Sequence, residues 1–303
     1  MREYEIEGPL YFIHPLFHTM FDVVIPLGPN DVKHFGQQLE HTRKYVIGYR
    51  RIYIVAFDPG LAASCVASST ESSGASSEDS VNGASSYDSV NGASSTESSD
   101  DGDSVIVVPE SAFPFSKNTV SVYHGTNSRN GWYFQQLLKM YAWAYLDGLL
   151  DRYLVVDADT FFVNPTRFET TDGKCLYNFA REYNPPYFEH MARLSPIFTR
   201  TYELSGICHH MLFETGVVKE IIGQVEAAHK GKRFWEVFLE CVDVGLRHGI
   251  GSGASEYELY FHYIMKTRLD EVEIRELVWD NVTEWTPDKW VEHDYVAWHH
   301  YDQ

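Results

Sequence analysis

The stretch YLVVDADTFF, residues 153–162, runs from an apolar segment into two aspartates spaced one residue apart. A short run of branched apolar residues is typical of a strand buried inside a sheet. Upstream, from Arg129, apolar side chains recur at three- and four-residue spacing, which predicts an amphipathic helix ending near Gly148. We therefore expect a helix that leads directly into a buried strand over residues 153–156.

Two further strand-like runs, FDVVIPLGPND (21–31) and RIYIVAFDPG (51–60), end in Pro and Gly turn residues, and residues 105–108 form a third. Strands that alternate with helices predict βαβ units and a three-layer α/β fold with a mostly parallel sheet. We expect a single domain over residues 18–303, preceded by an N-terminal segment, 1–17.

Residues 62–103 differ in composition from the rest of the chain. They are mainly Ser, Gly, Ala and acidic residues, with a nine-residue repeat that reads GASSEDSVN, GASSYDSVN and GASSTESSD. Such a segment buries too little apolar surface to offset the entropy of ordering it. We expect a disordered, solvated insertion; a folded calcium-binding repeat is the alternative.

The charge of the chain excludes some classes of partner. Its formal net charge is -19, which repels nucleic-acid backbones and anionic membranes. Its four cysteines contain no CxxC pair, so we expect a reducing compartment. The N-terminus, MREYEIEGPL, is charged where a signal peptide is apolar, and no run of 18 apolar residues occurs. We expect a cytoplasmic protein without a membrane span.

The two aspartates, Asp157 and Asp159, follow their strand at the edge where α/β sheets bind ligands. In an extended chain their side chains point the same way. Two neighbouring carboxylates raise each other's pKa unless a cation lies between them. Oxygen ligands suit Mg²⁺ or Mn²⁺, which also bind phosphate oxygens. The pair therefore predicts a metal site for a diphosphate; the alternative is one turn cap and one solvated acid.

A phosphatase of the haloacid-dehalogenase type uses a similar motif, DxDx[TV], in which Asp157 would be the nucleophile. The position that this motif reserves for Thr or Val is Phe161 here. A non-catalytic carbohydrate-binding protein of the same fold is a third hypothesis. These alternatives stand beside the diphosphate hypothesis.

Seven segments, in this order, resemble the DUF6492 family of predicted glycosyltransferases: DVVIPLGPND, YRRIYIV, RNGWYFQQLLKMYAW, YLVVDADTFFVNPTRF, EYNPPYFEHMARL, SGICHHMLFE and GASEYELYF. The resemblance covers nearly the whole chain outside the insertion. It implies a GT-A-like (Rossmann-like) fold and a metal-dependent glycosyltransferase. Such an enzyme moves a sugar from a UDP- or GDP-sugar to an acceptor hydroxyl of a glycan, a protein or a small molecule, by direct displacement.

The resemblance also implies ligands for the metal and the donor. Asp157 and Asp159 would hold Mn²⁺ or Mg²⁺, and His299, of the pair His299-His300, would complete the metal shell. Gly206 would lie beside the donor sugar.

Glu256 is the predicted catalytic base, with Glu258 as the second choice. Ser255 can cap a helix that places Glu256 in its first turn, where a carboxylate could accept the proton of the acceptor hydroxyl. Stabilisation of an acidic residue by the helix dipole explains Glu256 equally well.

Further residues carry open alternatives. Pro26 and Asp58 occupy strand ends that contact the nucleotide in GT-A folds, or serve as turn residues. Arg129, and Arg50 or Arg51, would neutralise the diphosphate, or form surface ion pairs.

Two histidine-containing segments are also ambiguous. Of the pair His209-His210, at most one side chain can face the sugar, because successive residues of a strand point opposite ways; the other is explained by core packing. The aromatic segment 184–194, which includes Glu189 and His190, either contacts the acceptor or fills the core.

Overall fold

The central sheet of the computed structural model, which describes residues 20–71, 104–247 and 251–299, has five strands in the order β4-β3-β1-β5-β9. Strands β1, β3, β4 and β5 are parallel, and β9 is antiparallel to β5. Their bounds are β1 Phe21–Leu27, β3 Tyr49–Ala56, β4 Ser104–Pro109, β5 Arg152–Val156 and β9 His210–Glu214. The four predicted strands and the mostly parallel sheet are confirmed.

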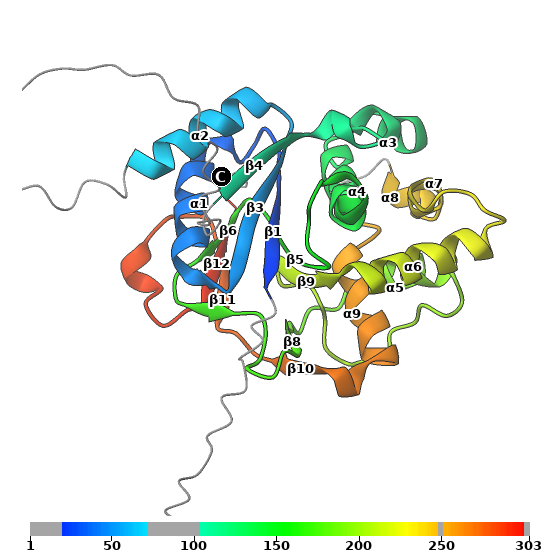
Figure 1. Cartoon of the computed structure of the whole chain (residues 1–303). Coiled ribbons are helices and arrows are strands. Elements are labelled where there is room, and N and C mark those ends of the chain that lie inside the picture. The colour runs from blue at the N-terminus through cyan, green and yellow to red at the C-terminus, as the bar shows by residue number, and fades with distance from the viewer. Residues whose placement is uncertain (1–19, 72–103, 248–250, 300–303) are drawn as a thin grey trace, which may run out of the picture.

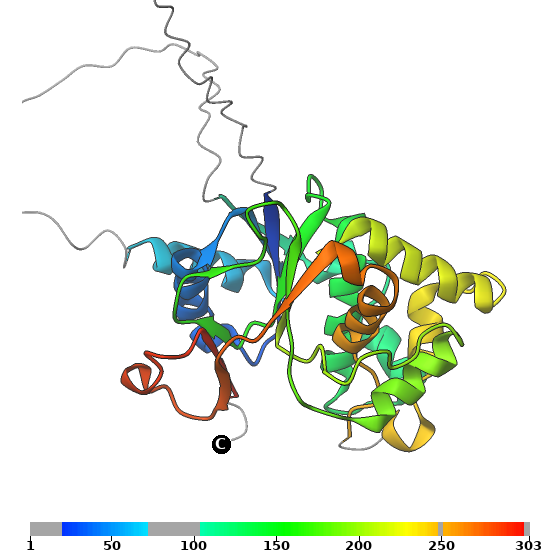
Figure 2. The same cartoon turned by 90° about the horizontal axis from the view of Figure 1, so that it is seen from below.

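Helices cover both faces of this sheet, so the predicted three layers are confirmed (Figures 1 and 2). One face carries α1 and α2, and the other carries α4, α6 and α9. These helices are α1 Val32–Tyr45, α2 Pro59–Glu71, α4 Asn130–Tyr145, α6 Thr215–Ala228 and α9 Glu256–Thr267, and α3 Lys117–His124, α5 Pro185–Leu194, α7 Phe234–Glu240 and α8 Val244–Arg247 are shorter. None of the helices in the described ranges is long and apolar enough to cross a membrane.

The order of the strands locates the binding edge of the sheet. From β1 the chain adds β3 and then β4 on one side, and afterwards returns to place β5 on the other side of β1. At such a Rossmann-like reversal, α/β sheets bind ligands beyond the carboxyl ends of the strands, here those of β1 and β5. Asp157 directly follows β5, and therefore lies at this edge.

Helix α2 corrects the predicted start of the insertion. Residues 62–71 were expected to be disordered, but they form the greater part of α2. Asp58 starts the helix, because its Oδ1 accepts hydrogen bonds from the N–H groups of Gly60 (2.9 Å) and Leu61 (3.1 Å). Ala62 is fully buried. Small residues that resemble a low-complexity segment here pack closely on α1. The rest of the predicted insertion and the predicted segment 1–17 lie outside the described residues.

Smaller sheets bring the last described strand to this binding edge. The strand β12, Tyr295–Trp298, pairs antiparallel with β6, Thr160–Phe162, and parallel with β11, Trp279–Val282. Strands β8, Cys175–Asn178, and β10, Val272–Arg275, form a parallel pair, and β2, Val46–Ile47, pairs with β7, Thr166–Arg167. Since β6 begins directly after Asp159, its pairing with β12 brings a distant segment to the two aspartates.

His190 on α5 belongs to the core, which confirms the packing alternative for this residue. Its side chain is fully buried, its Nε2 lies 2.8 Å from the carbonyl oxygen of Phe238, and the two rings pack edge to face. Burial lowers the pKa of His190 to about 3.

This lowered pKa predicts an acid-sensitive fold. Between pH 6.5 and about 3 the unfolded chain binds a proton at His190 and the folded chain does not, so stability falls as the pH falls through that window. At pH 5 the loss from this group is about 2 kcal/mol relative to pH 7. We expect the free energy of unfolding of His190→Gln, whose amide can still donate to Phe238, to fall by about 2 kcal/mol less between pH 7 and 5 than that of the natural chain. Urea unfolding at the two pH values measures this difference. An unchanged pH dependence would contradict this account.

Candidate metal centre

Asp157, Asp159 and His209 form the one group of potential metal ligands found within the described part of the chain. Each offers one ligand atom, and the three atoms lie within 4.8 Å of one another. Asp157 is held in place by its backbone, because its N–H donates to the carbonyl oxygen of His209 at 2.9 Å. The predicted pair of aspartates thus lies together at the carboxyl edge of the sheet, and His209 joins it.

His209 has an unusual backbone conformation that directs its ring into the site. Its φ is +59°, in the left-handed region, which costs a residue other than Gly about 1–3 kcal/mol. Its Nδ1 lies 3.5 Å from Oδ2 of Asp157. His210, the next residue, starts β9 and packs its buried ring against Phe162 and Tyr295. The two rings therefore lie apart, His209 in the candidate site and His210 in the core, although His209 lies outside the strand whose alternation was the reason for expecting this.

Lys139, in the middle of α4, was not identified from the sequence. Its side chain is only 3% exposed, and its Nζ donates to Oδ1 of Asp157, to Oε1 of Glu256 at 2.7 Å and to the hydroxyl of Tyr257 at 3.1 Å. The Tyr257 hydroxyl itself donates to Oδ1 of Asp157 at 3.0 Å. The available signal was a lysine inside the otherwise apolar run LLKMYAW.

The two carboxylate oxygens of Asp157 have different partners. Oδ1 receives the ammonium and the phenol, whereas Oδ2 faces His209. Lys139 and Tyr257 thus fix the orientation of the Asp157 carboxylate, and they leave Oδ2 directed toward the other two ligands. Such outer contacts commonly orient metal ligands.

The electrostatics of the network favour ionised side chains at Lys139 and Asp157. Burial alone would lower the pKa of Lys139, but the charges of Asp157 and Glu256 outweigh it and raise the pKa. For Asp157 burial acts in the opposite direction, yet Lys139 and His209 hold its pKa well below the ordinary value. Burial raises the pKa of Glu256, although Lys139 opposes the shift.

His299 lies beside Asp159 but is not one of the three grouped ligands. It follows β12, and its N–H donates to the carbonyl oxygen of Val282 at 2.8 Å. Its Nε2 lies 3.9 Å from Oδ2 of Asp159, and its ring centroid lies 5.5 Å from that of His209. Its role as a ligand stays a prediction. His300, the other member of the pair, lies outside the described residues.

Glu256 begins α9, as predicted, and Ser255 caps the helix by accepting a hydrogen bond from the N–H of Glu258 at 3.2 Å. Glu256 is 2% exposed, and its carboxylate is paired with Lys139 rather than open to solvent. Its role as the base stays a prediction. Glu258 is fully buried, and accepts hydrogen bonds from the hydroxyl of Ser205 (2.7 Å) and the N–H of Gly206 (3.0 Å).

Gly206 is required by close packing against α9. A Cβ atom added there would lie 2.5 Å from Cβ of Phe261 and 2.9 Å from the carbonyl oxygen of Tyr257. Since the obstructing atoms include backbone, the loop that leads to His209 can approach α9 only with glycine at this position. Its predicted contact with a donor sugar is a separate hypothesis.

We expect Gly206→Ala to destabilise the fold by about 1–3 kcal/mol through overpacking. It should also weaken metal binding, because the loop from Gly206 to His209 would shift. Gly216→Ala is the matched control: no atom lies within 4 Å of the added Cβ, and Ala in a helix is the more favourable residue. Thermal unfolding and Mn²⁺ titration compare the two variants. Equal effects would refute the packing argument.

The other predicted donor-site residues have structural contacts. The carbonyl oxygen of Pro26 accepts a hydrogen bond from the Gln135 amide at 3.2 Å, and Asp58 caps α2. Arg129 precedes α4, and its guanidinium lies 5.9 Å from the centre of the Trp132 ring. Contact of these residues with a nucleotide stays a prediction.

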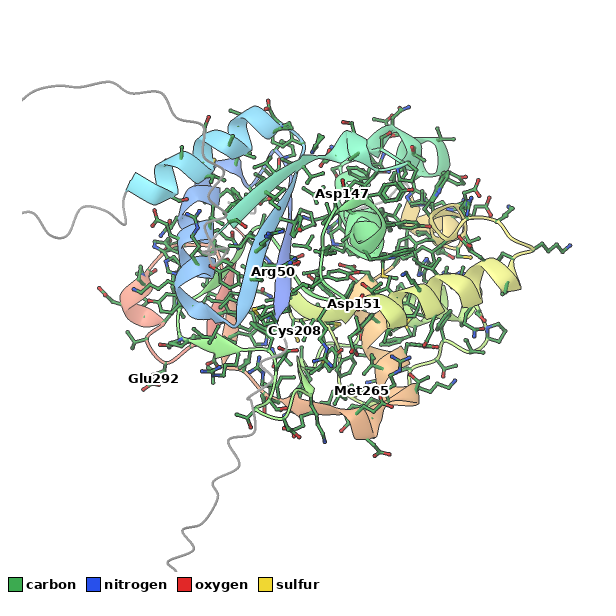
Figure 3. All side chains as sticks on the ribbon, viewed as in Figure 1. Arg50, Asp147, Asp151, Cys208, Met265 and Glu292 are labelled. Carbon is green, nitrogen blue, oxygen red and sulfur yellow. The ribbon has the colours of Figure 1, made fainter. Side chains whose placement is uncertain are left out.

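The prediction that Arg50 or Arg51 neutralises the diphosphate is wrong. Both lie near the start of β3, and parallel strands put that end at the edge opposite Asp157. Arg50 (Figure 3) donates to both carboxylate oxygens of the fully buried Asp22, at 3.0 and 2.8 Å. The guanidinium of Arg50 therefore stabilises the buried carboxylate of Asp22 through two hydrogen bonds.

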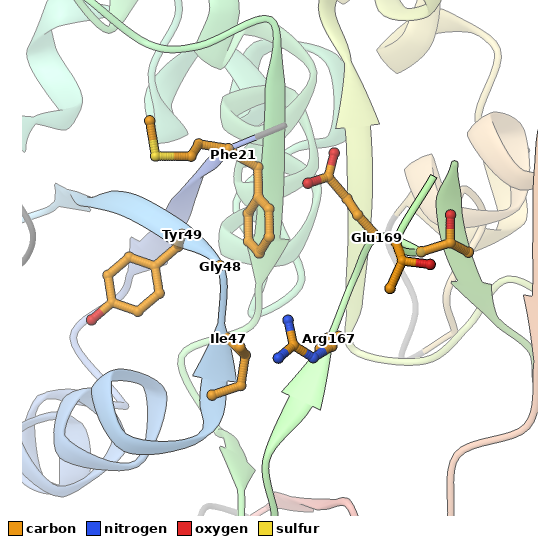
Figure 4. A pocket seen from close by; sticks show the side chains of 9 residues that line it. Phe21, Ile47, Gly48, Tyr49, Arg167 and Glu169 are labelled. Atoms are coloured by element: carbon orange, nitrogen blue, oxygen red, sulfur yellow. The ribbon is translucent and has the colours of Figure 1, made fainter. Parts of the chain in front are cut away.

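A pocket of about 230 Å³ opens at this same opposite edge (Figure 4). It is lined by Phe21 and Tyr49, the first residues of β1 and β3, and by Arg167. The pocket is thus separated from the metal centre by the length of the sheet.

A model of a family of unknown function, DUF6492, matches residues 88–301. The matched region contains all the candidate metal ligands, whereas the segments DVVIPLGPND and YRRIYIV lie outside it. No curated protein matches the chain. The chain belongs to DUF6492, a family of unknown function.

Proposed function

We propose that this protein is a metal-dependent glycosyltransferase of the GT-A type, which moves a sugar from a UDP- or GDP-sugar to an acceptor hydroxyl. The observation that carries the proposal is the cluster of Asp157, Asp159 and His209 at the reversal of the strand order. Sheets of this kind bind nucleotides at such a reversal. The four parallel strands in the order β4-β3-β1-β5 support the proposal that this half of the domain binds a nucleotide.

The donor set of the cluster suits Mn²⁺ or Mg²⁺. Two carboxylates and one imidazole are available, with His299 close by, and this mixture of oxygen and nitrogen ligands favours Mn²⁺ in particular. When bound, the ion would stabilise the charge of a departing nucleotide diphosphate. Asp157, Asp159 and His209 would hold the ion.

The charges around Asp157 also support a divalent cation. The network contains the carboxylates of Asp157, Asp159 and Glu256, the ammonium of Lys139, and His209, whose imidazole must be neutral to bind a metal. A buried excess of negative charge is costly unless a cation offsets it. A divalent ion bound by the two aspartates would offset that excess.

The predicted reaction is a direct displacement. The acceptor oxygen forms its bond to the anomeric carbon as the bond from that carbon to the diphosphate breaks, and the acceptor proton passes to a carboxylate base. Glu256 is the predicted base. Since Lys139 binds its Oε1 at 2.7 Å, the acceptor hydroxyl would donate its proton to Oε2 of Glu256.

The test is metal-dependent binding and turnover of nucleotide sugars by the full chain. We expect a UDP- or GDP-sugar to raise the unfolding temperature in the presence of Mn²⁺ and not in EDTA. Ligand at 100 times its dissociation constant stabilises a fold by roughly 2.7 kcal/mol. We also expect slow release of the nucleoside diphosphate, since water can replace the acceptor.

Other outcomes separate the competing hypotheses. Release of phosphate from an aryl phosphate would favour the phosphatase. Binding without release of nucleotide would favour a carbohydrate-binding protein. Full turnover of the nucleotide sugar in excess EDTA would rule the proposal out.

A further inference from the structure

A second pocket lies where the parallel strands β8 and β10 end. The chain leaves β8 through Phe179, Ala180 and Arg181 and leaves β10 through residues 276–279, and these two segments line a pocket of about 340 Å³. Side chains anchor its floor: Oδ1 of Asn178 accepts from the N–H of Leu277 at 2.9 Å. This bond joins the two segments that line the pocket.

This pocket adjoins the metal centre through two contacts. The ring of Trp279, which lines the pocket, lies 5.3 Å from the ring of His209, centre to centre. On the other wall, Ala180 exchanges two backbone hydrogen bonds of 2.9 Å with Ser205, the start of the segment that leads to His209. One lining residue thus contacts the proposed ligand His209, and the opposite wall is hydrogen-bonded to the segment that leads to it.

The lining suits a small, neutral molecule with both apolar and hydroxyl-bearing surfaces. Trp279, Leu277 and Val278 supply apolar contacts, and Arg181 and Glu276 face each other across the rim at 3.2 Å. This exposed ion pair offers donors and acceptors with no net charge, which does not select for a phosphate. Small-molecule pockets span roughly 300–1,000 Å³, so this one has room for about one ring.

Trp279 provides a rigid aromatic wall. Its ring stacks on Tyr295 at an interplanar angle of 8° and a centroid distance of 5.4 Å. The Tyr295 hydroxyl in turn accepts from Nδ2 of Asn178 at 3.1 Å. A fixed aromatic surface beside hydrogen-bonding groups matches a pyranose, which has apolar C–H faces and a rim of hydroxyls.

We infer that this pocket binds a neutral saccharide ring. Given the proposed function, the bound ring would be the acceptor, because Trp279, which lines the pocket, also contacts His209 of the proposed metal centre. The saccharide itself is recognised by Trp279 and by the Arg181–Glu276 pair, neither of which belongs to the proposed metal shell.

The experiment is saturation-transfer-difference NMR on the full chain, with a mixture of methyl glycosides of glucose, galactose, mannose and N-acetylglucosamine. Val278→Trp places a large side chain in the pocket. Val278 lines the pocket and is 54% exposed, so the larger side chain should not disturb the core. Val291→Trp is the matched control, since Val291 is 72% exposed and does not line the pocket. Mn²⁺ and UDP binding are measured on the same samples.

We expect at least one glycoside to bind the natural chain and Val291→Trp, and to lose its signal in Val278→Trp. Trp279→Ala should weaken binding of the same glycoside by roughly 2- to 10-fold. Absence of binding by every glycoside, or equal binding in Val278→Trp, would overturn the inference. If the chain binds UDP with Mn²⁺ but no glycoside, the saccharide inference fails and the proposed function is unaffected. If it binds a glycoside but not UDP with Mn²⁺, the saccharide inference holds and the proposed function fails.

Discussion

Lys139→Met should destabilise the protein by about 3–5 kcal/mol, the range found when one partner of a buried ion pair is removed. The substitution keeps much of the length of the side chain and removes its charge. Glu256 and Asp157 would then share a buried site without their ammonium, although Lys139 now binds both carboxylates. Urea unfolding at pH 7 measures the loss.

Two companion variants make this result interpretable. Lys232→Met removes an exposed lysine that pairs with Glu240 at 2.9 Å, and should cost no more than about 1 kcal/mol. Lys139→Met combined with Glu256→Gln should recover part of the stability, because one unpaired charge is gone. If Lys139→Met were as mild as Lys232→Met, the buried network would not have the energetic role assigned to it.

Asp157→Asn should abolish metal-dependent turnover and weaken Mn²⁺ binding by about 100-fold or more. Loss of an outer contact to a metal ligand typically costs about 10–100-fold in affinity, and here a ligand itself loses its charge. The amide keeps the shape of the side chain and can still accept from Lys139. Calorimetric titration with Mn²⁺ measures the affinity, and EDTA should reproduce the loss of turnover in the natural chain.

Asp151→Asn is the matched control for this variant. Asp151 is an exposed aspartate that directly precedes β5, whereas Asp157 directly follows it. The two positions therefore lie at opposite ends of one strand. Unchanged Mn²⁺ affinity in Asp157→Asn, or an equal loss in both variants, would refute the metal centre.

Much of the fold could be predicted because its signals are local. The apolar runs that became β1, β3 and β5 are short and bounded by turn residues, and the spacing of α4 is helical throughout. The two aspartates were predictable for the same reason: they directly follow a strand, and parallel strands place such residues at the binding edge. Asp157 and Asp159 needed no information from distant parts of the chain.

The partners of these aspartates were harder to predict, because they depend on contacts between distant residues. Lys139 meets Glu256, 117 residues further along the chain, only when α4 and α9 pack together on the sheet. The orientation of His209 depends on a left-handed backbone conformation. A histidine in the sequence does not predict that conformation. Arg50 was misplaced for a different reason: it lies at the start of its strand, and in a parallel sheet that end lies opposite the binding edge.

The pairing of β12 with β6 also sets the order in which the centre can form during synthesis. The N–H of Trp298 donates to the carbonyl oxygen of Asp159, but the ribosome makes Asp159 first. At about 5–20 residues per second, roughly 7–28 s pass before Trp298 is added. During that interval the nascent chain contains both aspartates and β6 but not the strand that pairs with β6, so a product truncated before β12 would leave the edge of β6 next to Asp159 unpaired.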